Sequence, residues 1–322
     1  MLWKLYKEKL LWLRLQHGWS QEEAAQRCGT PDKKQYHLWE TGKTERPRAR
    51  NIEGIVRGFE LETSADILLQ PGQVIAPELR IFYAAHFNRP DLHNPIATAS
   101  IQNGARLICF SLDQTLTQGY QLSWKEVWGL LGKESVLRKK GLKLFHTGQM
   151  SYEGWCSWCC QIYRRHQITR AQLEALAGKF TLFPGVREGL QELRDSGFKL
   201  ALVSGSLDVF LDVLLPDYST LFDQVFINRS HFDANGIIRS MTPTPFDQER
   251  KADAIRYLCS LYGIEPAQSV YVGSAYIDKF VINAAGKTIA FNSTSDEIRD
   301  VFDITLDAAH FNTLVMHLKK LL

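Results

Sequence analysis

After residue 105, several side chains that could bind an anion or transfer a proton follow short apolar runs. An aspartate can donate or accept a proton, whereas hydroxyl groups, a glycine amide and a lysine ammonium can hold an anion. At the strand ends these residues are Ser111, Asp113, Ser204 and Gly205. They predict a binding site for a small anionic ligand.

Five short apolar runs predict the strands that must position these side chains. They are Leu107–Phe110, Lys199–Val203, Val225–Ile227, Ser269–Val272 and Thr288–Phe291. Helical patterns such as Val186–Ser196 and Lys251–Tyr262 lie between them, and this alternation favours an α/β fold with a parallel sheet. Ligands of such sheets bind at the carboxyl ends of the strands, where the candidate residues fall.

Residues 105–322 resemble the haloacid dehalogenase (HAD) superfamily, and most closely its phosphoserine-phosphatase-like branch. The segments that carry the resemblance occur in the family's order. They are SLDQT, GQMSYEGW, LFPGVREGLQELRDSGFKLALVSGS, Lys251 and VYVGSAYIDKFVINAAGKTIAFN. The resemblance implies a Rossmann-like parallel sheet with a helical cap over about residues 119–182. It also implies that Thr115 and Lys251 join the ligand-binding residues and that the ligand is phosphorylated.

Two positions depart from the family's catalytic pattern. The family's leading aspartate attacks phosphorus and binds magnesium, but this chain has Ser111; a second metal carboxylate is replaced by Ser274. Magnesium prefers carboxylate oxygens, and a serine needs a base to become a good nucleophile. We therefore expect no metal cofactor and no catalysis: a pseudophosphatase, in which Ser111, Asp113, Lys251 and Asp278 are residual catalytic positions.

Two alternatives remain open for this domain. In the first, it is an active HAD-type phosphatase or hydrolase in which Ser111 or water attacks phosphorus, with Mg²⁺ as its cofactor. In the second, it is an interaction scaffold that binds no ligand, because a fold does not fix a function.

The cap region carries a tryptophan- and cysteine-rich segment. In phosphoserine phosphatases a cap helix bears an arginine for the substrate carboxylate, and alignment places Cys159 at that position. Cys156, Cys159 and Cys160 fall inside a predicted helix, which favours packing over a redox pair. All 6 cysteines lack a disulfide-framework spacing, as is typical of a reducing compartment.

The first 66 residues predict a separate helical domain. Ser20 and Glu23 form a capping-box pattern, glycines end the expected helices, and WSQEEAAQRCG…QYHLWETGK resembles the Cro/CI-like (XRE) helix-turn-helix family over about residues 4–61. Tyr36 and Trp39 should face its core. Residues 67–104, with six Pro and Gly positions and an apolar patch at Ile81–Tyr83, are expected to be a linker that includes a dimer contact.

The XRE resemblance implies a set of DNA-binding residues. Lys33, Lys34, Gln35 and His37 would read bases, Gln21 would touch a phosphate, and Lys43 and Arg46 would follow the backbone. Residues 1–60 carry 12 Lys and Arg against 8 Asp and Glu, so the positive excess lies here. The alternative is a helical bundle with a solvated basic face.

Taken together, these patterns predict a DNA-binding transcription regulator whose HAD-like domain senses a small anionic metabolite. A homodimer is expected, because one reading helix buries little surface on DNA. No apolar run reaches the ~18 residues of a membrane helix, which favours a cytoplasmic protein.

Overall fold

The computed structural model of the chain describes residues 3–17, 19–30, 32–69, 83, 106–132 and 136–321. The chain divides into two compact units, residues 1–94 and 95–322. Most of the predicted linker 67–104, with the expected dimer contact at Ile81–Tyr83, lies outside the described residues. Strand β2 (Leu68–Leu69) lies at the start of that range and pairs with β1 (Lys4–Leu5), so these two residues belong to the N-terminal unit.

The described part of the N-terminal unit is mainly helical. It consists of α1 (Lys7–Gln16), α2 (Gln21–Arg27), α3 (Lys33–Glu40), α4 (Ala49–Gly58) and a short 3-10 turn at Ser64–Asp66. The predicted capping box is confirmed: the Glu23 amide donates to Ser20 Oγ at 3.1 Å, and the Ser20 amide donates to Glu23 Oε2 at 2.9 Å. Tyr36 and Trp39 are fully buried, as predicted.

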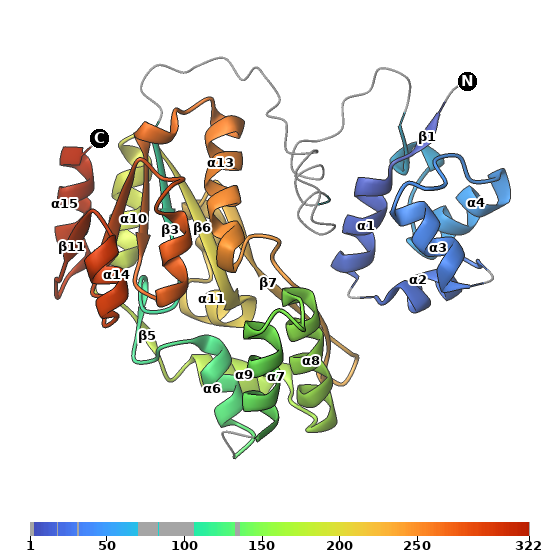
Figure 1. Cartoon of the computed structure of the whole chain (residues 1–322), viewed down its shortest axis with the longest axis horizontal. Coiled ribbons are helices and arrows are strands. Elements are labelled where there is room, and N and C mark those ends of the chain that lie inside the picture. Colours follow the sequence, from blue (N-terminus) through green and yellow to red (C-terminus); the bar gives the residue numbers. More distant parts are fainter. Residues whose placement is uncertain are drawn as a thin grey trace. The chain divides into compact units, whose positions relative to one another are not determined.

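The C-terminal unit is built on a seven-stranded sheet within its described residues (Figure 1). The strand order is β11 (Ile304–Leu306), β10 (Lys287–Phe291), β9 (Ser269–Gly273), β3 (Arg106–Phe110), β6 (Phe198–Leu207), β7 (Gln224–Phe232) and β8 (Ile238–Thr242). All five predicted strands are present and pair in parallel, which confirms the α/β fold. The edge strands β8 and β11 were not predicted, and β8 runs antiparallel.

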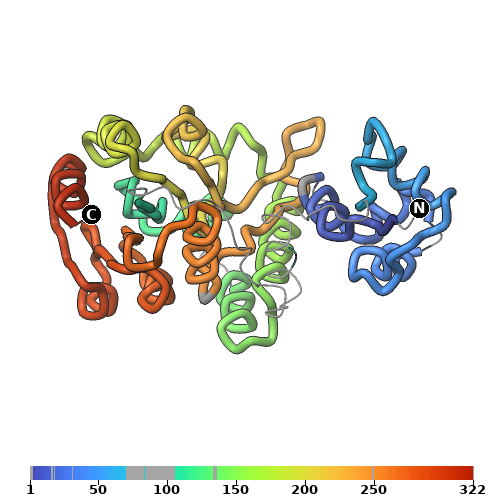
Figure 2. Tube along the Cα trace, turned by 90° about the horizontal axis from the view of Figure 1, so that it is seen from above, coloured from blue at the N-terminus to red at the C-terminus, as the bar shows by residue number. Residues whose placement is uncertain are grey.

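Helices cover both faces of this sheet (Figures 1 and 2). Ile108 and Phe110 of β3 pack in one apolar cluster with α10 (Val186–Asp195) and α15 (Phe311–Leu321). The intervening Cys109 faces Cys259 of α13 (Lys251–Tyr262) on the other side. Buried strands with apolar side chains on both faces are typical of a covered parallel sheet. Shorter helices α11 (Asp208–Leu214), α12 (Tyr218–Leu221) and α14 (Asp296–Val301) complete the layers.

A helical cap is inserted where the sequence predicts it. It contains α6 (Ser123–Gly129), α7 (Val136–His146), α8 (Tyr152–Arg165) and α9 (Arg170–Ala177). The chain leaves and re-enters the core through β4 (Thr117–Gln118) and β5 (Thr181–Leu182), which pair antiparallel. Cys156, Cys159 and Cys160 are buried in the cap core, and burial raises the pKa of each thiol, so they act as packing residues.

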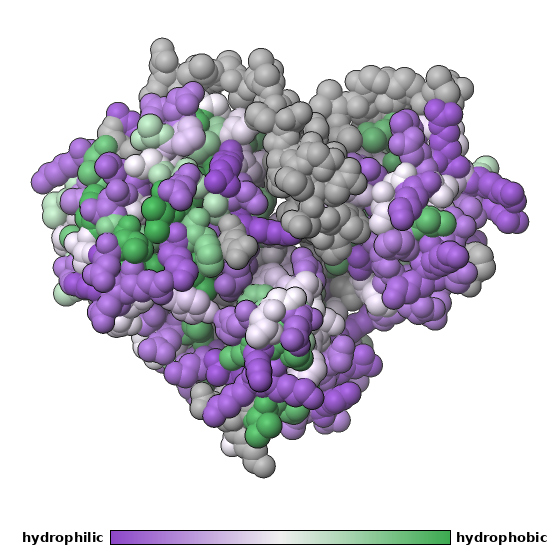
Figure 3. All heavy atoms as spheres, in the orientation of Figure 1, coloured by the Kyte–Doolittle hydropathy of each residue, from purple (hydrophilic) through white to green (hydrophobic). Residues whose placement is uncertain are grey.

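The face of the protein seen in Figure 3 is mostly hydrophilic, with only small apolar areas. Within the described ranges, no helix combines the length and the apolar character needed to cross a membrane.

Candidate active site

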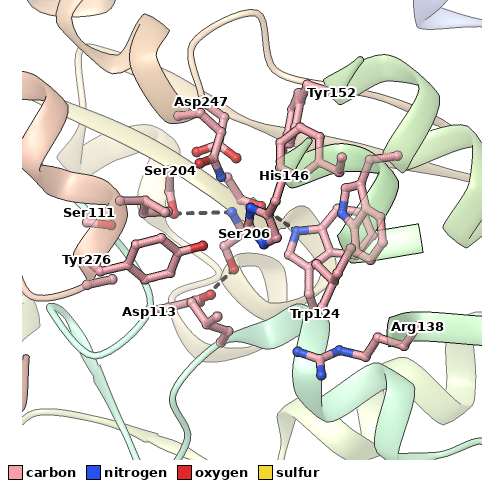
Figure 4. A pocket seen from close by; sticks show the side chains of 18 residues that line it. Ser111, Asp113, Trp124, Arg138, His146, Tyr152, Ser204, Ser206, Asp247 and Tyr276 are labelled. Atoms are coloured by element: carbon pink, nitrogen blue, oxygen red, sulfur yellow. Dashed lines mark hydrogen bonds between the residues drawn. The ribbon is translucent and has the colours of Figure 1, made fainter. Parts of the chain in front are cut away.

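A cavity of about 80 Å³ lies between the cap and the carboxyl ends of β3 and β6 (Figure 4). From the core it is lined by Ser111, Asp113 and Ser204–Ser206, and by Asp247 just before α13. Aromatic side chains of the cap and Tyr276 form much of the remaining wall. The cavity therefore joins polar groups at the strand ends to an apolar, aromatic roof.

Asp113 is the carboxyl group at the centre of this polar end. Its Oδ1 accepts from the Tyr120 hydroxyl at 3.0 Å and the Ser206 hydroxyl at 2.7 Å. Its Oδ2 accepts from the amide and hydroxyl of Ser123 at 2.9 and 3.1 Å. Since Ser123 begins the cap helix α6 and Ser206 lies on β6, Asp113 joins the two halves of the site.

The protonation of Asp113 is set by two opposing effects. Burial raises the pKa of this carboxyl above its usual range, and the hydrogen bonds from Ser123, Ser206 and Tyr120 offset part of the increase. A raised pKa keeps a larger fraction protonated at a given pH, which is the state a general acid requires.

The segment Ser204–Ser206 forms an irregular part of β6. The pairing of β6 with β7 shifts register between Val203 and Leu207, so these residues leave the regular ladder. The Gly205 carbonyl accepts from Trp124 Nε1 at 2.7 Å and from Asn228 Nδ2 at 2.6 Å. The Ser206 amide donates to Ser204 Oγ at 3.3 Å. These contacts hold the turn in one orientation and attach the cap to the core.

A second polar cluster lies behind the cavity. Lys251 Nζ donates to Asp278 Oδ1 at 2.6 Å, and the Tyr271 hydroxyl donates to the same oxygen at 2.7 Å. Lys251 and Asp278 are fully buried. Tyr271 also interacts with the Ser111 side chain, which lowers the pKa of the Tyr271 hydroxyl against the larger, raising effect of burial, so Tyr271 lies between Ser111 and Asp278.

The loop Ser274–Asp278 is held by hydrogen bonds within the protein. The amides of Ser274 and Ala275 donate to Asp278 Oδ2 at 2.9 and 3.0 Å. Ser274 Oγ donates to the Asp113 carbonyl at 3.2 Å and lies 2.9 Å from Thr115 Oγ1. Both hydroxyl groups are therefore used within the protein.

The structure brings together only part of the predicted ligand-binding set. Ser111, Asp113, Ser204 and Gly205 line one cavity. Thr115 and Lys251 do not line it, because Thr115 is hydrogen-bonded to Ser274 and the Lys251 ammonium is neutralised by Asp278. Neither residue is therefore placed to contact a ligand in this cavity.

Several residues of the site were not predicted from the sequence. Ser206, Ser123 and Tyr120 hold Asp113, Tyr271 contacts Ser111, and Asp247 lines the cavity. Ser206 lies two residues beyond a predicted position on the same segment, which was a usable signal. The others come from distant parts of the chain, and no local pattern marks them.

The residues predicted to contact DNA lie on the N-terminal unit. Lys33, Lys34, Lys43 and Arg46 are exposed, and Gln35 and His37 are half-buried. Gln21 Nε2 donates to Glu40 Oε2 at 2.5 Å and lies 3.3 Å from His37 Nδ1, and its contact with a phosphate stays a prediction. Gln21 thus ties α2 to α3, because Glu40 is buried and also pairs with Arg14.

Comparison with known proteins identifies the family of the C-terminal unit. A family model described as haloacid dehalogenase-like hydrolase matches residues 105–286. The chain belongs to this family. The phosphoserine phosphatase SerB2 of Mycobacterium tuberculosis is 28% identical over 217 residues, which cover 65% of this chain and 49% of that enzyme. The chain therefore spans about half the length of SerB2.

Other members of the haloacid dehalogenase-like family are also similar. A phosphoserine phosphatase of Archaeoglobus fulgidus is 26% identical over 260 residues, covering 80% of this chain and 72% of that enzyme. The structure of a substrate-bound phosphoserine phosphatase has a TM-score of 0.54 at 21% identity, covering 67% of this chain and 99% of that one. The latter similarity shows a shared fold.

These relatives correct the functional prediction. Because they are phosphoserine phosphatases, they contradict a DNA-binding transcription regulator with a non-catalytic, ligand-sensing HAD domain. The helices of the N-terminal unit are present, but their assignment to a helix-turn-helix stays a prediction, as does the homodimer.

Phosphatases of this family normally use Mg²⁺, so a cofactor-free protein is not supported by the comparisons. The donors at the family's metal positions nevertheless fit Mg²⁺ poorly. Ser111 and Ser274 offer neutral hydroxyls, and Asp278 already binds an ammonium, a hydroxyl and two amides. In the described part of the chain, no three His, Cys, Asp or Glu side chains are grouped to hold a metal ion.

Proposed function

We propose that this chain is a phosphatase that hydrolyses a small phosphomonoester in the cavity between cap and core. The observation that carries this proposal is Asp113, a buried carboxyl of raised pKa that faces the cavity beside Ser111, Ser204 and Gly205. A proton donor next to a set of anion-binding groups is what cleavage of a phosphate ester requires. The phosphatase relatives support the same reaction class.

The geometry supports a two-step reaction. In the first step, Ser111 Oγ forms a bond to phosphorus while the ester P–O bond breaks, and Asp113 gives its proton to the departing oxygen. The Ser111 proton passes to the neighbouring Tyr271 oxygen, whose own proton moves to Asp278 along their hydrogen bond. In the second step, water attacks the phosphoserine, Asp113 takes the water proton, and Asp278 returns the proton to Ser111 through Tyr271.

Replacement of Ser111 tests the nucleophile. Ser111→Ala should lower the rate of phosphate release at least about 10²-fold, because no oxygen remains to form the covalent intermediate. Release of inorganic phosphate from a panel of small phosphate esters measures this effect. Ser157→Ala, an exposed serine on the outer side of α8, is the matched control. Full activity of the Ser111→Ala enzyme would show that water attacks phosphorus directly.

The poor fit to Mg²⁺ leads to a second prediction. Phosphate release should persist in EDTA and should not rise when Mg²⁺ is added, because the neutral hydroxyls of Ser111 and Ser274 replace the metal carboxylates. Initial rates with a chelator and with millimolar Mg²⁺ are compared on the same enzyme preparation. A rate that falls to background in EDTA and returns with Mg²⁺ would contradict this prediction and would keep the phosphatase function.

A further inference from the structure

Asp247 is a buried carboxylate without a complete set of partners. It is 7% exposed, and its Oδ1 has no hydrogen-bond partner. No ion pair involves it among the residues that the structure describes. Burying an unpaired charge costs several kcal/mol of free energy, and a cation bound beside the carboxylate would offset this cost.

The side chain of Asp247 is directed into the cavity. Figure 4 shows both of its oxygens turned toward Ser204 and Ser206. A Cβ built on Gly205 would lie 2.2 Å from Asp247 Oδ2, so the carboxylate packs directly against this glycine. Asp247 also raises the pKa of two cavity-lining hydroxyls, Tyr152 and Tyr276, in both cases after the larger effect of burial.

Aromatic rings surround the same space. Trp124, Phe145, Tyr152, Trp155 and Tyr276 all line the cavity. Ring centroids are 6.0 Å apart for Trp124 and Trp155, and 6.1 Å apart for Phe145 and Tyr152. Faces of aromatic rings attract cations, and an ammonium group enclosed by several rings is a recurring arrangement in binding sites.

The charge balance of the cavity favours a substrate that carries its own cation. A phosphate held by Ser111, Ser204 and Gly205 would bring negative charge close to Asp247, since Asp247 touches Gly205. An ammonium group on the alcohol part of the ester would lie between these charges and attract both. Arg138 and His146 also line the cavity. The Arg138 guanidinium is a cation, but it lies across Trp124 from Asp247 in Figure 4.

We propose that Asp247 and the aromatic side chains around it bind an ammonium group, so that the preferred substrates are phosphate esters of small amino alcohols. This inference rests on the proposed phosphatase function and names its substrate class. Asp247 contributes the charge, and the rings of the cap contribute the walls that exclude water from the ion pair.

The test compares two esters that differ in one group. O-Phosphoethanolamine and propyl phosphate have the same chain length, but only the first carries an ammonium. In the wild-type enzyme, kcat/KM should favour phosphoethanolamine at least about tenfold. Asp247→Asn should bring this ratio close to one by lowering kcat/KM for phosphoethanolamine, because the amide carries no charge to attract the ammonium. Asp300→Asn, an exposed aspartate of α14, is the matched control.

The outcomes separate this inference from the proposed function. If the wild-type enzyme hydrolyses both esters equally well, the ammonium site is wrong and the phosphatase function stands. If neither ester nor any other phosphomonoester is hydrolysed, the phosphatase function is wrong. Calorimetry with the same two esters then still decides the ammonium site: tighter binding of phosphoethanolamine that is lost in Asp247→Asn supports it, and equal affinities overturn it.

Discussion

Asp113→Asn is expected to lower kcat for phosphate release by about 10²–10⁴-fold, the usual contribution of a general acid. The amide keeps the shape of the side chain but cannot give a proton to the departing alcohol. The hydrogen bonds of Tyr120 and Ser206 to Oδ1 can be retained, whereas the Ser123 amide and hydroxyl both lose their acceptor when an NH2 group replaces Oδ2. Steady-state phosphate release, with a thermal melt to confirm folding, measures the effect.

The pH profile gives a second measurement of the same residue. Because burial raises the pKa of Asp113, the protonated acid persists above the usual range of aspartate, and kcat should fall as pH rises through that pKa. Asp113→Asn should remove this alkaline limb. A substrate with a good leaving group, such as p-nitrophenyl phosphate, needs less proton transfer and should lose less activity. An equal loss with both kinds of substrate would argue against the acid role.

Lys251→Met is expected to lower the free energy of unfolding of the C-terminal unit by about 3–5 kcal/mol. The methionine leaves Asp278 as a fully buried carboxylate with no cation beside it, while the Tyr271 hydroxyl and two amides remain as donors. Urea unfolding followed by tryptophan fluorescence measures the change. Lys279→Met, which breaks a more exposed ion pair with Glu297, is the control and should cost under about 1 kcal/mol.

A double variant distinguishes loss of charge balance from loss of packing. Lys251→Met combined with Asp278→Asn leaves no unpaired charge, and the asparagine oxygen can still accept from the Ser274 and Ala275 amides. The double variant should therefore be more stable than Lys251→Met alone. If the losses of unfolding free energy in Lys251→Met and in Asp278→Asn add up to the loss in the double variant, the ion pair is not the source of the stability.

The main elements of the fold could be predicted because their local signals are strong. β3 and β9 are buried on both faces, so each is a continuous apolar run that ends at a polar residue. The capping box at Ser20 places α2, and α13 begins and ends at the predicted residues. Because Ser111, Asp113, Ser204 and Gly205 follow predicted parallel strands, the sequence also predicted that they lie at one edge of the sheet. In the structure these four residues line one cavity. The edge strands β8 and β11 were missed because their burial is mixed and their apolar pattern is weak.

The partners of the site residues followed only from the folded arrangement. Lys251 was expected to hold an anion, but the fold places it against Asp278, 27 positions further along the chain. Asp247 has no motif around it, and its role depends on its packing against Gly205 and the cap. Local patterns act over a few residues, through backbone hydrogen bonds and side-chain periodicity, and so they determine strands, helices and caps. Charge pairing and cavity shape depend on distances between residues far apart in the chain, and packing alone sets these distances.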